Sequence, residues 1–410
     1  FKPSVGDAAM KWLEQVAKGL EQTDAAGLRR HLKVVESPWG RRVRVNDREL
    51  LAFCSNDYLG LAAHPAVVQA LQDGAQRYGA GSGASHLISG HTRAHAELEV
   101  RLAGLYAPWV PEARALYFST GYMANVSLLT ALAQLDDEVE FFSESLNHAS
   151  LIDGMRMARA RISVYAHNDV QQLETLLAAS TASTRIIVTD SVFSMDGNLA
   201  PLAELDRLAQ QYDAALVIDD AHGFGVLGDS GLGALEHLSL HSPRILYMGT
   251  LGKAAGVSGA FVVAHDQLIE WLVQRARAYI YTTASSPALA HAVLASLDII
   301  TSDEGADRRQ RLQANCRHLS ESIYLQKWGL PDSDTAIQPV IIGSNINVTK
   351  VAGFLMHQGL WVPAIRPPTV PPDTARLRIT VSAAHMPDDV FRLGRAINRA
   401  EREIEDDAYL

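Results

Sequence analysis

Cysteine is scarce in this chain, and long apolar runs are absent from it. Only Cys54 and Cys316 occur among the 410 residues, and two isolated cysteines supply neither a disulfide framework nor a thiolate zinc site. No apolar run reaches the roughly 18 residues of a membrane-spanning helix, and the first residues lack the basic-then-apolar pattern of a signal peptide. We therefore expect a reduced, cytoplasmic setting, no metal and no membrane partner.

The chain also lacks an excess of positive charge. Its 36 lysines and arginines are outnumbered by 46 aspartates and glutamates, which gives a formal net charge of −10. Such a chain repels the phosphates of nucleic acids, so we exclude a general nucleic-acid surface. The stretch 29–48 is an exception, with seven basic residues against two acidic ones. It is either the solvated face of a hairpin or a binding site for phosphates. The second interpretation rests on the preference of arginine for bidentate phosphate contacts.

The length exceeds what one hydrophobic core usually organises, so a large and a smaller domain are expected. Residues 7–30 show helical apolar spacing, and 41–53 alternate around Asn46-Asp47 as a hairpin does. Farther on, expected helices alternate with apolar runs: helices at 65–78, 93–106, 121–134 and 201–212, and runs at 115–118, 185–190, 214–219 and 259–265. Several runs are apolar on both faces, as strands of a parallel, helix-covered sheet are.

The last third of the chain has a pattern of its own. It predicts helices at 287–302, 305–326, 346–359 and 387–405, and strands at 337–342 and 375–382. The fold class is therefore α/β, with a large domain built on a mostly parallel sheet. We place an N-terminal arm at 1–57, the large domain at 58–285 and a smaller C-terminal α/β domain at 286–410.

The segment AALVIDDAHGFGVLG (214–228) carries the strongest chemical signal. An apolar strand ends at Asp219, and His222 follows three residues later. In an open parallel sheet, ligands bind beyond the carboxyl ends of the strands. A carboxylate there can keep a pyridine nitrogen protonated, which makes pyridoxal phosphate (PLP) an electron sink. The alternative is that Asp219 only caps the following turn.

A lysine among small residues comes next, in RILYMGTLGKAAGVSGAFVV (244–263). Lys253 stands between two apolar strands, and Thr250 offers a hydroxyl to a phosphate. Burial lowers an amine pKa, as a Schiff-base lysine requires. For Lys253 alone, a surface position is the better interpretation. The ordered pair of a strand with Asp219 and His222 and a strand with Lys253 favours the cofactor lysine.

Other strand ends and helix starts offer further contacts. In FSTGYMANVSLL the chain leaves a strand and turns at Gly121, where the amides of a helix start form an anion site, and Tyr122 supplies a ring. His148, in SLNHASLIDG, either stacks on a cofactor or caps its helix. Ser194 follows a strand end, from which it can reach a phenolic oxygen.

Three competing motifs fail on context. GAGSGA (79–84) loosely fits a dinucleotide fingerprint, but a helical stretch precedes it instead of a strand. His91 and His95 are four residues apart, yet no glutamate lies between them and no third ligand is evident, so we expect no zinc site. Thr250-x-x-Lys253 resembles the Ser-x-x-Lys motif of enzymes that form an acyl-enzyme, but the companion motifs of those enzymes are absent.

These stretches, with SNDYLGL (55–61), GSGASHLISGHTRAH (81–95) and FSMDG (193–197), lie in a familiar order and spacing. Over nearly its whole length the chain resembles the α-oxoamine synthases, PLP-dependent enzymes of fold type I. The resemblance implies an aspartate aminotransferase-like transferase fold. It also implies an acyltransferase that joins an amino acid to an acyl thioester with loss of carbon dioxide.

The resemblance also implies a role for each candidate residue. Lys253 forms the Schiff base and moves the α-proton, Asp219 pairs with the pyridine nitrogen, and His148 stacks on the ring. His222 and Ser194 contact the phenolic oxygen. The expected phosphate ligands are Gly121, Tyr122, Thr250 and Thr283 of the partner subunit, with Thr282 as the alternative. The expected assembly is therefore a homodimer with its sites at the interface.

The substrates are indicated by the segment AIRPPTVPPDTARLRITVSAAH (364–385). It is most similar to members that join L-alanine to a pimeloyl thioester, carried by coenzyme A or an acyl carrier protein, in biotin biosynthesis. The resemblance assigns the amino-acid carboxylate to Arg378, with Asn56 nearby and Arg366 as the next candidate. Arg29, in the basic stretch, is a candidate for the carrier phosphates.

Two departures from the family pattern fall where substrates bind. Gly83-Ala84-Ser85-His86 stands where Gly-Gly-Ser followed by Arg or Gly is expected, and Ala254-Ala255 replaces Gly-Phe or Ala-Phe. They leave open a sister synthase, such as a glycine acetyltransferase or a longer-chain acyl transferase. A catalytically silent scaffold is the remote alternative, against which the intact set of Lys253, Asp219 and His222 argues.

Overall fold

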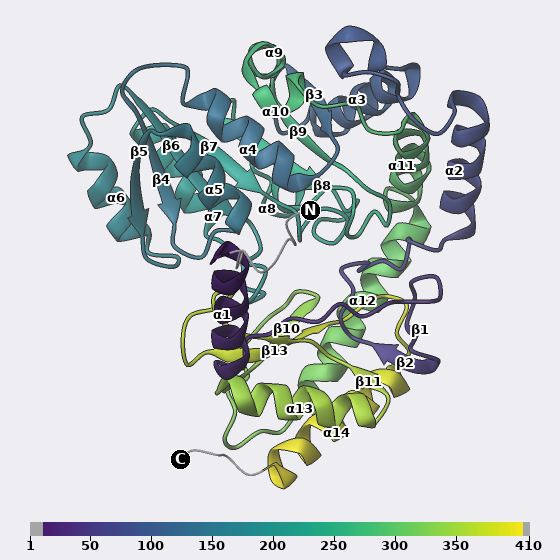
Figure 1. Ribbon diagram of the computed structural model, residues 1–410. Coiled ribbons are helices and arrows are strands. Elements are labelled where there is room, and N and C mark those ends of the chain that lie inside the picture. Colours follow the sequence, from purple (N-terminus) through teal and green to yellow (C-terminus); the bar gives the residue numbers. More distant parts are fainter. Residues whose placement is uncertain (1–10, 405–410) are drawn as a thin grey trace, which may run out of the picture.

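The computed structural model describes residues 11–404 and forms a larger and a smaller α/β part (Figure 1). The larger part holds a seven-stranded sheet in the order β3-β9-β8-β7-β6-β4-β5. Its strands are β3 (Ala113–Phe118), β4 (Val139–Glu144), β5 (Arg161–Tyr165), β6 (Thr184–Asp190), β7 (Ala214–Asp219), β8 (Ile245–Thr250) and β9 (Ala260–His265). The predicted α/β class is confirmed.

The sheet is mostly parallel, as predicted, but β9 runs against its neighbours. Strands β5, β4, β6, β7 and β8 pair in parallel, whereas β9 is antiparallel to both β8 and β3. The sequence predicted a strand at residues 259–265 but not its direction. The loop 251–259 is too short for the crossover that a parallel neighbour needs, which usually takes a dozen or more residues.

Helices cover both faces of this sheet because successive side chains of a strand point to opposite sides. In β6, Ile186 and Val188 pack on one face with Leu128 of α4, whereas Ile187 packs on the other with Leu208 of α7. The helices of the larger part are α2 (Pro65–Tyr78), the π-helix η1 (His86–Gly90), α3 (Arg93–Tyr106), α4 (Gly121–Leu132), α5 (Ala149–Ala158), α6 (Val170–Ala179), α7 (Leu202–Gln211), α8 (Ala234–Leu238), α9 (Asp266–Arg275), α10 (Arg277–Ile280) and α11 (Pro287–Ile300).

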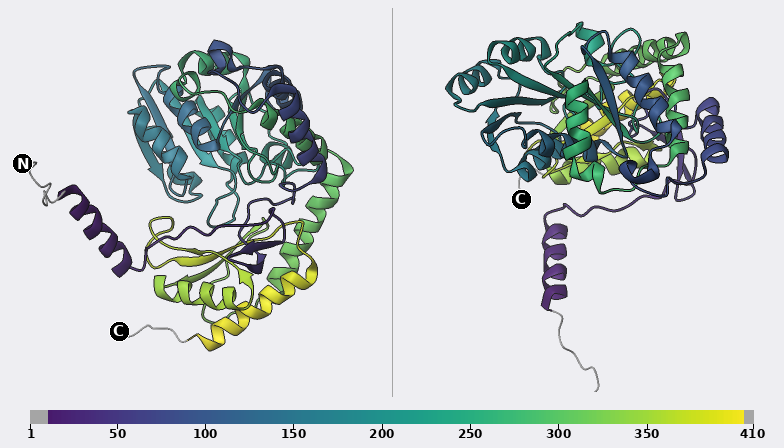
Figure 2. Two further views of the ribbon diagram at one scale, coloured as in Figure 1. Left: turned by 45° about the vertical axis from the view of Figure 1, so that its right-hand side comes forward. Right: turned by 90° about the horizontal axis from the view of Figure 1, so that it is seen from above.

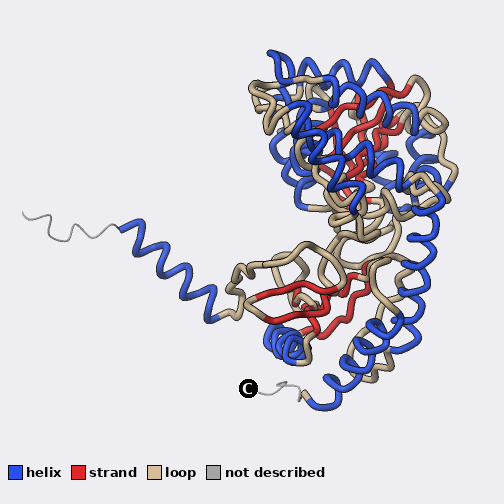
Figure 3. Tube along the Cα trace, turned by 90° about the vertical axis from the view of Figure 1, so that its right-hand side faces the viewer, coloured by secondary structure: helices blue, strands red, loops and turns tan. Residues whose placement is uncertain are grey.

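The smaller part contains a second sheet in the order β10-β13-β12. Its strands are β10 (Ile337–Gly343), β12 (Ala364–Ile365) and β13 (Ala375–Thr380), and its helices are α12 (Asp303–Ser322), α13 (Asn345–His357) and α14 (Pro387–Glu403). In Figure 3, α12 runs from the larger part down beside the smaller sheet. The helices and strands predicted for this part of the chain are confirmed to within a few residues.

The predicted hairpin is formed by β1 (Arg42–Val45) and β2 (Arg48–Ala52). Asn46 and Asp47 both have positive φ, 49° and 57°, as the tightest two-residue hairpin turn requires. Strand β2 also pairs in parallel with β11 (Leu360–Trp361). The domain boundaries at 57 and 285 remain a proposal, and this pairing places the hairpin beside the C-terminal part.

Helix α1 (Lys11–Ala25) stands away from the body of the chain (Figure 2). The prediction of a helix over 7–30 is confirmed for 11–25 and wrong for 26–30, which form a turn and irregular chain, while 7–10 lie outside the described part. None of its residues is buried, so its apolar side chains, Trp12 among them, are exposed. Within residues 11–404 no helix combines the length and apolarity of a bilayer span.

Candidate active site

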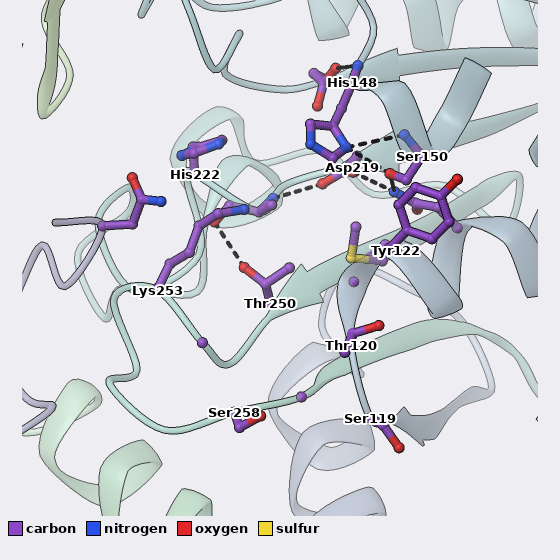
Figure 4. A pocket seen from close by; sticks show the side chains of 18 residues that line it. Ser119, Thr120, Tyr122, His148, Ser150, Asp219, His222, Thr250, Lys253 and Ser258 are labelled. Carbon is purple, nitrogen blue, oxygen red and sulfur yellow. Dashed lines mark hydrogen bonds between the residues drawn. The ribbon is translucent and has the colours of Figure 1, made fainter. Parts of the chain in front are cut away.

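A cavity of about 300 Å³ lies beyond the carboxyl ends of β7 and β8, between α4 and the loop after β8. Figure 4 shows side chains converging on it. It brings together the predicted residues Asn56, Gly121, Tyr122, His148, Asp219, His222, Thr250 and Lys253. A neighbouring cavity of about 940 Å³ shares Asn56, His148, His222 and Lys253 with it and adds Ser194 and Arg378. The cavity lies at the sheet edge that parallel α/β folds use for ligands.

Lys253 lies in the loop between β8 and β9 and borders both cavities. Desolvation of its amine lowers the pKa of Lys253, although the negative charges of Asp219 and Asp190 counteract part of that effect. The loop packs closely against the backbone of Leu61 and Ala62, because Gly256, at a φ of 68°, has no side chain that would collide with it. The amine is therefore easier to deprotonate than that of an exposed lysine.

Asp219 ends β7 and is 2% exposed. Its Oδ2 accepts a 2.7 Å hydrogen bond from Nδ2 of Asn125, and its Oδ1 accepts a 3.0 Å bond from the backbone N–H of Ala221. The predicted turn cap is thus present. The bond from Asn125 adds a second fixed donor, so the carboxylate is held in one orientation at the cavity wall.

His222 is buried and is held by a hydroxyl group. Its Nδ1 lies 2.6 Å from the Tyr58 hydroxyl, which lies 3.2 Å from Oδ1 of Asn56. Burial, with the nearby positive charges of Lys253 and Arg378, lowers the pKa of His222 well below its ordinary value. The imidazole is therefore neutral at neutral pH, and it can exchange hydrogen bonds with a polar ligand atom.

His148 precedes α5 and both of its proposed roles are compatible with its position. Its Nδ1 accepts a 3.3 Å bond from the Ser150 N–H, so the predicted helix cap is confirmed. Its own backbone N–H donates to Oδ2 of Asp190 over 2.6 Å. The ring also lines both cavities, which leaves stacking on a flat ligand as a proposal.

The opposite end of the cavity suits an anion. Thr120 caps α4 by accepting a 3.2 Å bond from the Met123 N–H, and Gly121 is the first helical residue. A Cβ at Gly121 would lie only 2.7 Å from Cγ2 of Thr250, so the backbone is open here only because the residue is glycine. The N–H groups and positive dipole end of a helix bind phosphate, and the hydroxyls of Thr250 and Ser258 border the same space.

Arg378 brings a guanidinium group into the larger cavity from β13. It is buried, its Nε donates to the Ser194 carbonyl over 2.5 Å, and its Nη1 donates to Asn56 Oδ1 over 3.1 Å. Within the described part of the chain, no carboxylate lies within ion-pair distance of it, whereas Arg376 pairs with Asp196 at 2.6 Å. A buried charge of this kind calls for an anionic partner.

Three predicted residues lie outside these two cavities. Arg29 pairs with Asp24 at 3.0 Å, and Arg366 donates to the backbone carbonyls of Gly27 and Arg29. Both arginines line a third cavity of about 700 Å³. This chain's own Thr283 is exposed and forms a bridge with Ser85 away from Lys253.

The sequence-based prediction missed the residues that support the site. Asn125, which donates to Asp219, is a polar residue one turn after Gly121 in an otherwise apolar helix, and that contrast was the available signal. Tyr58, which contacts His222, stands in the quoted stretch SNDYLGL without any pattern that reveals its partner. Such partners become visible only when segments distant in sequence meet.

Comparison with known proteins agrees with this geometry. The sequence matches the family model of aminotransferase class I and II over residues 48–397. It is 59% identical to the 8-amino-7-oxononanoate synthase of Janthinobacterium sp. (strain Marseille) over 393 residues, which cover 96% of this chain and 99% of the relative. It is 58% identical to the enzyme of the same name from Bordetella petrii, with the same coverage.

Solved structures show the same fold. A serine palmitoyltransferase from S. paucimobilis, described with bound PLP, superposes with a TM-score of 0.87 at 26% identity, covering 97% of this chain and 98% of that one. The 8-amino-7-oxononanoate synthase of Francisella tularensis superposes with a TM-score of 0.72 at 27% identity, covering 86% of this chain and 98% of that one.

The residues of the cavity fit PLP. A desolvated lysine amine, the fixed carboxylate of Asp219 and the glycine-opened start of α4 match an aldehyde, a pyridine nitrogen and a phosphate in turn. The chain therefore belongs to the aminotransferase class I and II family and, within it, to the PLP-dependent α-oxoamine synthases.

Proposed function

We propose that this chain catalyses the reaction of 8-amino-7-oxononanoate synthase, the decarboxylative condensation of L-alanine with a pimeloyl thioester in biotin synthesis. The observation that carries the proposal is the identity of 54–59% over nearly the full length to relatives of that name. The geometry supports it, because a desolvated lysine and an unpaired buried arginine face connected cavities. An amino acid can bind there by its carboxylate, with its α-carbon near an amine.

PLP, when bound, supplies an electron sink for negative charge at the α-carbon of an amino acid. The residues that would hold it are the predicted ones. Lys253 would bind it covalently through its amine, Asp219 would face the pyridine nitrogen, and His148 would cover one ring face. His222 and Ser194 would contact the phenolic oxygen. Gly121, Tyr122 and Thr250 would hold the phosphate, together with Thr283 of the partner subunit.

Two groups of this chain handle protons. Once the amino acid has replaced its amine on the cofactor, Lys253 would take the α-proton, since its lowered pKa leaves more of the neutral amine than an exposed lysine has. General base catalysis of this kind contributes about 10²–10⁴-fold. Asp219 holds a proton at the pyridine nitrogen, and its bonds from Asn125 and Ala221 keep the carboxylate aimed at that atom.

Arg378 positions the amino acid. Its guanidinium is already held by Asn56 and Ser194, so binding a carboxylate does not require ordering a mobile side chain. Hydrogen bonds between charged groups are shorter and stronger than neutral ones. The carboxylate that is later lost as carbon dioxide is thereby placed in the larger cavity, near Lys253.

The acyl substrate extends toward a basic cavity. The cavity that contains Arg378 shares Pro363, Ile365, Pro367 and Thr369 with the third cavity. The basic residues of that third cavity are Arg29, Arg30, His31, Lys33 and Arg366. We place the phosphates of coenzyme A or of an acyl carrier protein there, because the two cavities together lead from Lys253 to this charge.

Other arginines of the basic stretch are engaged elsewhere. Arg41 pairs with Asp389 at 2.7 Å, and Arg42 pairs with Glu49 at 3.1 Å across the β1–β2 hairpin. The stretch 29–48 therefore divides into a part that lines a cavity and a part, with Arg41 and Arg42, that forms ion pairs elsewhere. The carrier is assigned to the first part only.

The assembly is proposed to be a homodimer, supported by the exposed position of Thr283 and by the exposed aromatic ring of Tyr281 beside it. Aromatic residues are enriched at protein interfaces. A reducing cytoplasmic setting is supported by Cys54 and Cys316, both of which are free thiols.

A substrate matrix tests the proposed function. Glycine, L-alanine and L-serine are each combined with acetyl, pimeloyl and palmitoyl thioesters, and the release of carbon dioxide and free thiol is measured. We expect L-alanine with the pimeloyl thioester to give the highest kcat/KM. A preference for glycine with the acetyl thioester, or for L-serine with the palmitoyl thioester, would assign the chain to a sister synthase instead.

A further inference from the structure

Three histidines outside the cofactor cavities converge where η1 meets α3. His86 begins η1, His91 follows its end, and His95 lies in the first turn of α3. Their ring centroids are 5.0, 5.3 and 5.7 Å apart, and one nitrogen of each lies within 4.8 Å of the others. The sequence-based argument against a zinc site rested on the lack of a third ligand for His91 and His95. The fold supplies a third histidine, His86.

Two of the nitrogens are already close to the separation that one shared metal ion needs. His86 Nδ1 and His91 Nδ1 lie 3.0 Å apart. In a tetrahedral site with metal–nitrogen bonds of about 2.0–2.1 Å, two ligand nitrogens are about 3.3 Å apart. A small outward rotation of either ring gives that distance.

The second ring nitrogens of His91 and His95 face groups of the kind that support metal-bound histidines. His91 Nε2 lies 3.7 Å from Oε2 of Glu99, just beyond hydrogen-bond distance, while its Nδ1 faces His86. His95 Nε2 donates to the Ser285 carbonyl over 3.0 Å. Metal-bound histidines typically donate their second N–H to a carboxylate or a backbone carbonyl, which fixes the tautomer.

Three hydrogen bonds compete with coordination. One joins Nδ1 of His86 to Nδ1 of His91 over 3.0 Å, and another joins the Thr92 hydroxyl to Nδ1 of His95 over 3.2 Å. Donation from Nε2 leaves Nδ1 of His95 with a lone pair, and this atom accepts a 3.0 Å bond from the Thr92 N–H. Coordination through Nδ1 replaces the bonds from Thr92. Losing one neutral hydrogen bond weakens binding by about 2–13-fold, and a metal bond to a neutral imidazole offsets such a loss.

Burial and charge also suit a cation. His86 and His95 are buried, whereas His91 is exposed and open to an ion that arrives from solvent. Glu99 lies beside His91 and supplies a carboxyl group that can balance part of the charge of the ion.

We propose that His86, His91 and His95 bind one divalent transition-metal ion of the Zn²⁺, Co²⁺ or Ni²⁺ type. Imidazole ligands suit these ions. The ion would tie the η1–α3 segment to Ser285, which lies two residues after the exposed Thr283. Its role is to stabilise this part of the surface, and it takes no part in the chemistry at Lys253.

The test uses the untagged, PLP-loaded protein after treatment with a chelator, because a polyhistidine tag would itself bind the ion. Zn²⁺ is added, unbound ion is removed by gel filtration, and bound zinc is measured by elemental analysis with calorimetry for the affinity. We expect one ion per chain. With free Zn²⁺ at 100 times Kd, we expect the melting temperature to rise by about 3 °C.

Variants locate the ion. His91→Ala changes an exposed ligand and should weaken binding by at least about 100-fold, and Glu99→Gln should weaken it by about 10–100-fold as an outer-contact change. His265→Ala is the matched control, because His265 belongs to a second group of possible ligands, with Glu112 and Asp266. This variant should keep the parent affinity.

Three results would overturn the proposal. The parent protein could bind no zinc at micromolar concentrations, which would make the histidines a hydrogen-bonded cluster only. Binding could survive His91→Ala unchanged, or it could disappear in His265→Ala, which would place the ion at the second group. A circular dichroism spectrum equal to that of the parent shows that a variant which loses the ion is still folded.

Discussion

Arg378 Nη1 donates a 3.1 Å hydrogen bond to Oδ1 of Asn56, although 322 positions separate the two residues in the chain. Arg378 lies on β13 of the smaller part, and Asn56 lies just before the larger one. The contact joins the two parts at the point where both border the cavity of Lys253. The proposed carboxylate site therefore depends on how the two parts meet.

Replacing Arg378 tests that site. Arg378→Ala should raise the KM for L-alanine at least about tenfold, because a hydrogen bond to a charged group contributes about 1.5–3 kcal/mol. PLP affinity, followed by its visible absorption, should change much less. Arg366→Ala is the control, since Arg366 binds backbone carbonyls of residues 27 and 29 outside this cavity. An alanine KM that rises only in the control would move the carboxylate site to Arg366.

Asp219→Asn should leave PLP bound and slow α-proton exchange strongly. An amide cannot hold the pyridine proton as a carboxylate does. Asn125→Ala is a graded companion, because it removes the 2.7 Å bond that orients Asp219 and keeps the carboxylate itself. Deuterium exchange at the alanine α-carbon should fall most in Asp219→Asn and less in Asn125→Ala. Equal exchange in all three proteins would contradict the role given to Asp219.

The basic cavity is tested by charge reversal. Arg30→Glu combined with Lys33→Glu should raise the KM for the pimeloyl thioester about fivefold or more, from two exposed charge contacts worth about 0.2–1 kcal/mol each before reversal. The effect should shrink with salt, which screens exposed charges beyond about 10 Å at 0.1 M. Arg42→Glu is the control, because Arg42 pairs with Glu49 on the hairpin. A larger effect from this control would return the carrier to the hairpin face.

His385 predicts how stability depends on pH. It is buried, accepts a 3.0 Å bond from the Ser382 N–H, and its Nε2 lies 2.9 Å from the Ala52 carbonyl. Burial lowers its pKa from 6.5 to about 4. Between pH 6.5 and about pH 4, His385 is protonated in the unfolded chain but not in the folded chain. The free energy of unfolding therefore decreases as the pH is lowered through this range. At about 1.4 kcal/mol per pKa unit, the loss approaches about 3 kcal/mol.

Urea unfolding between pH 7 and pH 4 measures how the free energy of unfolding changes with pH. In His385→Gln this free energy should change less with pH than in the parent, although the variant should be less stable than the parent at pH 7. His357→Gln serves as the control, since His357 is exposed on α13. A parent-like slope in His385→Gln would show that other groups determine the acid sensitivity.

Local patterns were enough to predict most of the fold. The helices at 65–78 and 93–106 were predicted with the observed bounds, because capping residues and apolar periodicity coincide there. The direction of β9 was missed, since an apolar strand has the same composition whichever way it runs. The direction of β9 depends on the short loop 251–259 before it, and apolar periodicity carries no information about that.

The residues of the site also divide into those that local sequence patterns predict and those that they do not. Asp219 and Lys253 were predicted because each follows a strand end that a parallel sheet brings to one edge. His86 was not recognised as a neighbour of His91 and His95, since it lies five residues earlier and only the π-helical turn of η1 places its ring among theirs. Asn125 and Tyr58 were missed for a different reason, because their partners lie far away in sequence.

The proposed reaction requires Lys253 to move the α-proton of L-alanine. This is measured by the rate at which the α-proton of L-alanine exchanges in deuterium oxide, in the parent and in Lys253→Ala, each supplied with PLP. We expect measurable exchange in the parent and a loss of about 10²–10⁴-fold in the variant, the range of general base catalysis. Exchange at the parent rate in a folded, PLP-binding Lys253→Ala protein would contradict this role of Lys253.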